Sequence, residues 1–333
     1  MASGQRRRVQ AIGNAIVDLE VEVDDRFVER LGVAKGQMML VDAALQREVL
    51  AALEGHRVHR SSGGSAANTA VGIAELGGEA AFCGKVARDE LGSFYLEDLR
   101  RANVQVATLP GDGQTGTCVV LVTPDAQRTM LTHLGAAQDL AAHDVAGVDL
   151  RGCAWLYVEG YLFTGEATRA AALAAIERAK AEGVRVALTA SDPFVIDRCR
   201  DALWDLIDGP VDLLFCNEQE ARALTRLDDV VECAREVHRH AASVALTLGP
   251  KGSLLMDDGT LHPVEGVPAR AVDTTGAGDM YAAGVLYALA AGLDWPTAGH
   301  LASHAAARVV TQFGARLPRR FTPEEMAALS RRR

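Results

Sequence analysis

The chain has 333 residues, a formal net charge of −10 at neutral pH and a pI near 5.4. This acidic balance argues against a general affinity for nucleic acid or for an anionic membrane surface. No apolar run approaches the roughly 20 residues of a transmembrane helix, and no signal-peptide pattern precedes the first expected strand, so we expect a cytoplasmic protein. The six cysteines form no CxxC pair and are expected to be buried free thiols.

The first part of the chain predicts short strands. Residues 9–15 have the pattern of a strand that ends in a glycine turn, and residues 18–23 alternate polar and apolar side chains. Residues 37–41 are a candidate partner of the alternating strand. One polar face suits an accessory sheet better than a central one. From the residues alone, Asn14 and Asp18 are turn and solvent-facing polar residues.

A second group of elements follows. Residues 61–70 form a glycine loop that opens a helix, and residues 117–122 and 128–132 predict a hairpin. From Cys153 onward the chain alternates strands and helices, which implies parallel pairing with right-handed crossovers. The predicted fold class is therefore α/β: a doubly wound, mostly parallel sheet flanked by helices. Residues 1–333 are expected to form one domain.

The most informative stretch is the glycine loop at residues 271–280, which leads into a helical pattern. The unpaired N–H groups of a first helical turn favour a phosphate or a developing oxyanion. Asp279 lies just inside that turn. Its carboxylate either complements the helix dipole or acts as a general base beside an anion hole.

The residues Asp273-Thr274-Thr275-Gly276-Ala277-Gly278-Asp279 resemble the DTxGAGD signature of the ribokinase-like (PfkB) family of carbohydrate and nucleoside kinases. The resemblance extends in the family's order from Asn14 to Asp279. Residues 13–18, 36–39 and 159–163 look most like the adenosine kinase subgroup. Neither the dinucleotide-binding pattern G-x-G-x-x-G after the first strand nor a P-loop is present, which disfavours a Rossmann dehydrogenase and a classical P-loop NTPase.

The resemblance implies transfer of the γ-phosphoryl group of ATP, with Mg²⁺, to a hydroxyl. It also implies a small sheet that acts as a lid, built from insertions at about residues 15–45 and 113–134. Asp279 would be the catalytic base, and the transferring phosphoryl group would be held by Gly276, Ala277, Gly278 and Arg128. The implied substrate residues are Asn14, Asp18, Gly64 and Asn68. An apolar slot for a purine would be formed by Met39, Leu134 and Phe163.

The remaining implied residues concern the nucleotide and metal ions. The nucleotide contacts are Asn217, Thr247, Gly249, Gly252 and His304. Magnesium would be held near Glu220 and Glu218, and a monovalent cation such as K⁺ by Asp273, Thr275 and Gly314. From the residues alone, the acids at 217–220 could instead complement a helix dipole, and residues 247–252 could be a plain hairpin turn.

On this resemblance we expect a nucleoside as the acceptor, adenosine first, phosphorylated on its 5′-hydroxyl. A ribokinase-type sugar kinase is the alternative, because the ribose-binding residues would serve both substrates. A non-catalytic nucleoside or sugar sensor is a third hypothesis. The expected partners are small molecules only, and the chain could act as a monomer or a homodimer.

Overall fold

The computed structural model describes residues 8–107, 110–125, 127–317 and 319–331. Within these residues the chain builds two sheets. The large sheet has nine strands in the order β14-β13-β12-β11-β10-β9-β1-β5-β6, and the small sheet has five in the order β3-β8-β7-β2-β4. The strands of the large sheet are β1 (Arg8–Ile12), β5 (Ala80–Cys83), β6 (Val104–Val106), β9 (Cys153–Glu159), β10 (Arg185–Thr189), β11 (Leu213–Asn217), β12 (Ser243–Thr247), β13 (Gly252–Asp257) and β14 (Thr260–Glu265). The strands of the small sheet are β2 (Ile16–Glu22), β3 (Met38–Leu40), β4 (His59–Gly63), β7 (Thr115–Val122) and β8 (Arg128–Gly135).

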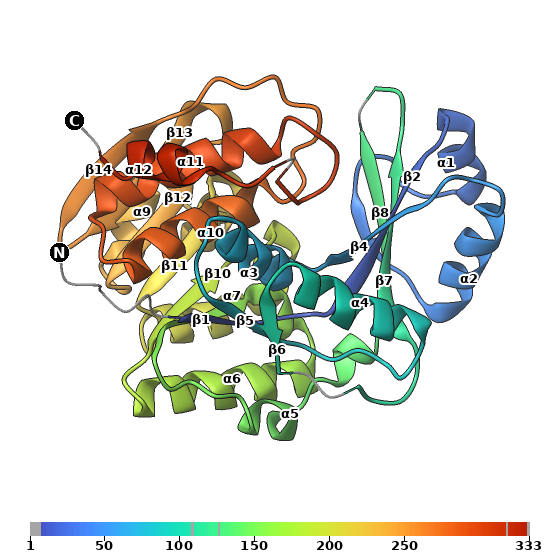
Figure 1. Ribbon diagram of the computed structural model, residues 1–333, viewed down its shortest axis with the longest axis horizontal. Helices are drawn as coiled ribbons and strands as arrows, with labels where there is room; N and C mark the ends of the chain where they lie inside the picture. Colours follow the sequence, from blue (N-terminus) through green and yellow to red (C-terminus); the bar gives the residue numbers. More distant parts are fainter. Residues whose placement is uncertain (1–7, 108–109, 126, 318, 332–333) are drawn as a thin grey trace.

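Helices cover both faces of the large sheet (Figure 1). Neighbouring strands from β6 to β12 are parallel, whereas β13 and β14 are antiparallel to their neighbours. The central strands are apolar on both sides, as in β9, where every residue is buried, so both faces need a cover. One face packs against α3 (Ser65–Glu75), α10 (Ala277–Ala290) and α11 (Trp295–Val309). The other face packs against α5 (Ala142–Ala146), α6 (Glu166–Ala181), α7 (Pro193–Ile207), α8 (Glu218–Thr225) and α9 (Val230–His238). The predicted doubly wound fold is confirmed.

Two further helices complete this part of the fold. Helix α4 (Glu90–Arg101) packs beside β4 and β6, and α12 (Pro323–Leu329) packs on α11. In the described part of the chain, none of the helices combines the length and the apolar character that crossing a membrane requires.

The two faces of the small sheet differ in chemistry. Side chains alternate along β2, so that Val17, Leu19 and Val21 are buried on one face, which packs against α1 (Asp25–Leu31) and α2 (Ala43–Ala52) (Figure 1). Asp18 and Glu20 point the opposite way, toward the large sheet. The polar face expected from residues 18–23 therefore faces a site inside the molecule.

The pairing of the small sheet differs from the prediction in two places. Residues 38–40 pair with β8 at the edge of the sheet, because β2 is already flanked by β4 and β7. Strand β4 was not predicted, since its sequence, His-Arg-Ser-Ser-Gly, has neither alternation nor β-branched residues. It forms because β2 provides an open edge.

The connection pattern of the large sheet produces a crevice. Strand β1 lies between β5 and β9, so the chain leaves β1 toward one side of the sheet and later returns on the other. Open α/β sheets bind ligands outside the carboxyl ends of their strands at such a switch point. Asn14 follows β1, and Glu159 ends β9, so both lie at this position.

Candidate active site

The glycine loop forms the N-terminus of α10, as predicted. Gly276 precedes the helix with a φ of 73°, and a Cβ at this position would lie 2.4 Å from the Cβ of Ala315, so only glycine fits. Gly278 lies in the first turn, where backbone N–H groups have no acceptor inside the helix. The Ala277 N–H instead donates to the Thr274 carbonyl at 3.2 Å. The loop can therefore hold an anion chiefly through the backbone around Gly278 and Asp279.

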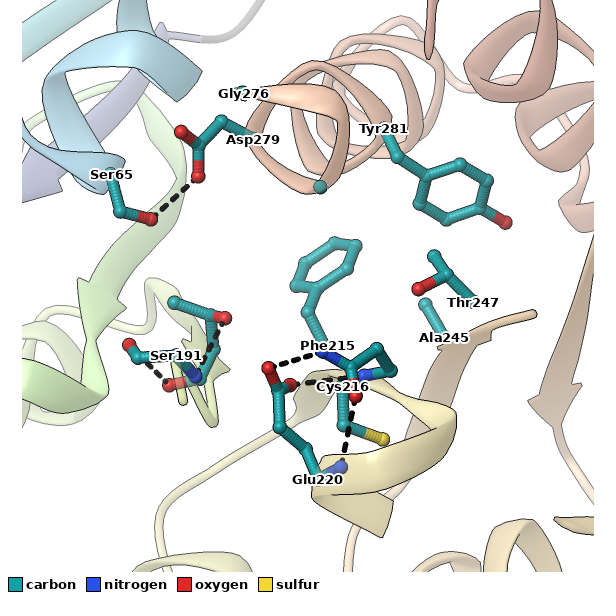
Figure 2. Close-up of a pocket in the computed structure, with 13 residues that line it drawn as sticks. Ser65, Ser191, Phe215, Cys216, Glu220, Ala245, Thr247, Gly276, Asp279 and Tyr281 are labelled. Atoms are coloured by element: carbon teal, nitrogen blue, oxygen red, sulfur yellow. Dashed lines mark hydrogen bonds between the residues drawn. The ribbon is translucent and has the colours of Figure 1, made fainter. Parts of the chain in front are cut away.

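Asp279 is held by two side chains of α3. Ser65 Oγ donates to Asp279 Oδ1 at 2.6 Å, and Asn68 Nδ2 donates to Oδ2 at 3.1 Å. Figure 2 shows the Ser65 hydroxyl turned toward the carboxylate at the start of the helix. Burial raises the pKa of Asp279 above its usual value, and these two hydrogen bonds oppose the rise. The structure thus presents an oriented carboxylate with increased basicity.

Two cavities meet at Asp279, and Ser65 and Ser191 line both of them. The first has a volume of about 220 Å³ and lies against the glycine loop. Its other walls come from the carboxyl ends of β11 and β12, which contribute Asn217 and Thr247. Its position beside unpaired N–H groups suits a phosphate-bearing ligand. The second cavity lies between the large and the small sheet.

The second cavity has a volume of about 250 Å³ and combines a polar and an apolar part. The polar part includes Asn14, Asp18, Gly64 and Glu159. The apolar part consists of side chains from the small sheet, from the turn after β9 and from the first turn of α7: Ile16, Met38, Leu40, Cys118, Met130, Leu134, Tyr161 and Phe194. A ligand with a hydroxyl-rich portion and a flat apolar portion would match both parts.

Glu159 organises the polar part and was not predicted. It is 1% exposed and accepts hydrogen bonds from Asn14 N at 2.7 Å, Asn14 Nδ2 at 2.8 Å and Ala66 N at 3.0 Å. Burial raises its pKa to about 7, against the lowering effect of those donors. Glu159 thereby fixes Asn14 relative to the start of α3. An acid at the carboxyl end of an otherwise apolar strand was the signal that could have identified it.

Asp18 enters the same cavity from the small sheet. Burial and the nearby Glu20 raise its pKa to about 7, whereas Arg316 lowers it. Arg316, which was also not predicted, donates from Nη2 to Ser62 Oγ at 2.7 Å. Its positive charge lowers the pKa of Asp279 as well.

The comparisons with known proteins agree with this geometry. The pfkB family carbohydrate kinase profile matches residues 33–321. The chain belongs to this family. An adenosine kinase structure from Sinorhizobium meliloti is 37% identical, with a TM-score of 0.86 over 97% of this chain and 98% of that one. A probable sugar kinase structure from Rhizobium etli CFN 42 is 35% identical, with a TM-score of 0.90 over 97% and 99% of the two chains. A fructokinase from Klebsiella pneumoniae is 31% identical over 246 residues, which are 71% of this chain and 79% of the fructokinase.

As a PfkB kinase, the protein is a phosphotransferase with an alcohol group as acceptor, and family membership implies ATP, typically with Mg²⁺. Its relatives act on different acceptors, so the family alone does not select between a carbohydrate and a nucleoside. The residues of the two cavities bear on that choice.

The acid at the wall of the first cavity is Glu220. Together with Asn217 it forms the capping box of α8: Asn217 Nδ2 donates to Glu220 Oε1 at 2.6 Å, and Asn217 N donates to Oε2 at 3.0 Å. Figure 2 shows these bonds on the side of the cavity opposite Asp279. Burial raises the pKa of Glu220 to about 7. Glu218, in contrast, pairs with Arg222 at 2.8 Å and does not line the cavity, which favours Glu220 over Glu218 for magnesium.

The predicted nucleotide contacts of this PfkB kinase are only partly brought together. Thr247 lines the first cavity, whereas Gly249, Gly252 and His304 line neither cavity. Gly252 has a packing role, since a Cβ there would lie 2.0 Å from the Val264 carbonyl oxygen on the neighbouring strand. His304 packs edge-on against His300 with ring centroids 4.5 Å apart, and burial lowers its pKa.

Of the three residues predicted for the apolar slot, Leu134 lines the second cavity, whereas Met39 and Phe163 do not. Met39 points to the other face of the small sheet and packs into the core there, whereas its neighbours Met38 and Leu40 line the cavity. Phe163 is 1% exposed and is buried in the core below the large sheet. Tyr161 and Phe194 supply the aromatic walls instead.

Arg128 does not line either cavity, and its contact with the transferring phosphate stays a prediction. Its guanidinium contacts the Asp273 carboxylate and lies 3.7 Å from Glu20 Oε1. Asp273 Oδ1 accepts the Thr275 N–H at 2.8 Å, and Oδ2 accepts the Gly314 N–H at 2.6 Å. The three residues predicted to hold a monovalent cation thus meet each other directly.

Proposed function

We propose that this PfkB kinase transfers the γ-phosphoryl group of ATP to the 5′-hydroxyl of a nucleoside, with adenosine as the favoured acceptor. The observation that carries the proposal is the position of Asp279 at the junction of two cavities. One cavity is walled by an anion-binding loop, and the other is walled by acids and by an apolar slot. This is the arrangement that a transfer between two different ligands requires.

In this mechanism Asp279 accepts the proton of the acceptor hydroxyl while that oxygen attacks the γ-phosphorus of ATP. The bond between this phosphorus and the β–γ bridging oxygen breaks, and ADP leaves. Ser65 and Asn68 orient the carboxylate through their hydrogen bonds. The backbone N–H groups at the start of α10 stabilise charge on the transferred phosphoryl group. Positioning and charge stabilisation supply most of the catalysis in phosphoryl transfer. We further propose that the small sheet acts as a lid that excludes water from the acceptor cavity.

The site fits Mg²⁺ through a single buried carboxylate. Glu220 would hold the ion, with Asn217 beside it; no group of three or more potential metal ligands is present among the described residues. Such a sparse site is typical of Mg²⁺, which keeps most of its water and is bound through one or two carboxylates and the substrate phosphates. Bound there, the ion would neutralise negative charge on the phosphates.

The lining of the acceptor cavity supports a nucleoside. Asn14 and Asp18 can hydrogen-bond sugar hydroxyls, and Tyr161, Phe194 and Met38 offer flat apolar surface to a base. A free sugar would leave this surface without a partner. The similarity to an adenosine kinase at 37% identity supports adenosine as the first candidate. A sugar acceptor is the second candidate, supported by the similarity to the fructokinase and the probable sugar kinase.

The test is an assay of ATP consumption with Mg²⁺ and five acceptors: adenosine, inosine, guanosine, ribose and fructose. We expect the highest kcat/KM with adenosine and loss of turnover in Asp279→Asn. Asp229→Asn is the matched control, because Asp229 caps α9 and asparagine is an equally good cap. Turnover only with a free sugar would overturn the nucleoside assignment. Nucleoside binding without turnover on any acceptor would instead support the sensor hypothesis.

The packing of the small sheet also bears on assembly. Because α1 and α2 cover its outer face within one chain, that face needs no second subunit. We therefore favour the monomer over the homodimer, and a measurement of molar mass by light scattering tests this choice.

A further inference from the structure

The site predicted for a monovalent cation does not have the donor set of one. A hard cation is bound through oxygen atoms. Around Asp273, however, Thr275 and Gly314 present backbone N–H groups to the carboxylate. These two N–H groups donate one hydrogen bond to each Asp273 oxygen, and the Arg128 guanidinium forms an ion pair with the same carboxylate. The two N–H groups and the guanidinium all direct positive charge toward the Asp273 carboxylate, which is the group that a cation would have to bind.

The Arg128 guanidinium supplies the positive charge that Asp273 needs. The Asp273 side chain is 0% exposed, and that of Arg128 is 11% exposed, so their contact is shielded from solvent. A buried carboxylate without a partner would be costly, because its charge would be neither hydrated nor compensated. Glu20, with its side chain 10% exposed, adds a second negative charge on the other side of the guanidinium.

Arg128 and Asp273 belong to different parts of the molecule. Arg128 is the first residue of β8 in the small sheet, and Asp273 lies in the glycine loop that opens α10. The Asp273 carboxylate also fixes the loop, since it accepts the N–H of Thr275 directly before Gly276. The ion pair therefore connects the small sheet with the conformation of the anion-binding loop.

We propose that Arg128 is a positioning residue that takes the place of a monovalent cation beside the anion-binding loop, so that turnover needs no K⁺. This inference rests on the proposed function, since the loop acts on the transferred phosphoryl group. A diffusible ion would neutralise Asp273 whatever the position of the small sheet. A guanidinium carried by β8 does so only while the small sheet lies over the large one, and closure thereby orders the loop.

The experiment compares wild type, Arg128→Ala and Arg128→Lys in KCl, NaCl and choline chloride at equal ionic strength. We expect wild-type kcat/KM to agree within about twofold among the salts, and Arg128→Ala in choline chloride to lose on the order of tenfold to a hundredfold. Addition of KCl or of low millimolar guanidinium chloride should restore part of the Arg128→Ala activity. The lysine variant should keep more activity than the alanine variant. Arg60→Ala is the matched control, because Arg60 lies on β4 of the same sheet and its side chain is 50% exposed.

Thermal unfolding provides a second measurement that needs no turnover. K⁺ should raise the Tm of Arg128→Ala more than choline does, and should not do so for wild type. A wild-type rate that rises saturably with K⁺ would overturn the inference. The inference would also be overturned if neither K⁺ nor guanidinium restored any activity to Arg128→Ala and neither changed its Tm. If wild type turns over no acceptor at all, the proposed function fails, and the Tm comparison still decides the role of Arg128.

Discussion

The large and the small sheet use opposite solutions to the same packing problem. In the large sheet every residue of β9 is buried, and helices close both faces. In the small sheet, β2 alternates, with apolar side chains toward α1 and α2 and Asp18 and Glu20 toward the site. The large sheet therefore has no free face for a ligand and presents functional groups only at strand ends. The small sheet can use a whole face for recognition.

This difference divides the chemistry of the site. Asp279, Glu159 and Glu220, which belong to the large sheet and its helices, each accept hydrogen bonds from two or more neighbouring N–H or O–H groups. They are held in place before any ligand binds. Met38, Leu40 and Met130 of the small sheet offer mainly shape and apolar surface. We infer that the large sheet governs kcat and that the small sheet governs KM and acceptor choice.

The largest expected effect tests the large-sheet side of this comparison. Asp279→Asn should lower kcat by about 10²- to 10⁴-fold, because the amide cannot accept the hydroxyl proton. Acceptor binding, measured by calorimetry, should change little. A variant that kept more than about a tenth of wild-type turnover would show that Asp279 is not the general base.

The next effect tests the small sheet. Asp18→Asn should raise the acceptor KM by about tenfold to a hundredfold with a smaller change in kcat, because a charged acceptor of sugar hydroxyls is lost. An equal loss in kcat and kcat/KM would instead place Asp18 in the chemical step.

The same variant should have a pH-dependent effect on stability. The pKa of Asp18 is about 7 in the folded protein, above the 3.8 of an unperturbed carboxyl, so the folded state holds a proton that the unfolded state has released. Stability is then lost as the pH rises through this interval. Asp18→Asn should therefore raise Tm by several degrees near pH 8, and the gain should shrink toward about pH 5. A gain that stayed constant with pH would contradict the raised pKa.

A smaller effect separates the cavity from the core. Phe194→Ala should raise the KM for a nucleoside about tenfold, through lost stacking on the base, and leave the KM for ribose nearly unchanged. Phe163→Ala should leave both values nearly unchanged and lower the free energy of unfolding by about 3–5 kcal/mol, because it opens a cavity in the core. The two variants are distinguished by steady-state kinetics with a nucleoside and with ribose, and by unfolding in denaturant. Equal effects on nucleoside and ribose would argue against a base in the apolar slot.

The smallest effect concerns the pH dependence of the base. Ser65→Ala should lower kcat/KM by about tenfold at most, the worth of one hydrogen bond to a charged group. Since Ser65 lowers the pKa of Asp279, its removal should move the acid limb of the pH profile to higher pH. A shift to lower pH would mean that Ser65 does not stabilise the ionised carboxylate.

The sequence was sufficient wherever a feature is local. The glycine loop and α10 were predictable because loop, helix start and acid are contiguous, and the alternation of β2 indicated an accessory sheet. Residues in register across strands were not predictable. Met39 was predicted to line the apolar slot, but its neighbours Met38 and Leu40 line it instead. A shift of one position reverses the face of the sheet to which a strand side chain points.

Only the tertiary structure decided which distant groups meet. Ser65 and Asn68 reach Asp279 from more than two hundred residues earlier in the chain, and Asn14 reaches Glu159 because β1 and β9 are neighbours in the sheet. The same holds for Arg128 and Asp273. By itself the sequence determined most of the elements, the anion-binding loop and the kind of chemistry, because these depend on residue type and spacing. Charge compensation and the walls of the two cavities depend on contacts between elements, which exist only once the sheets have packed.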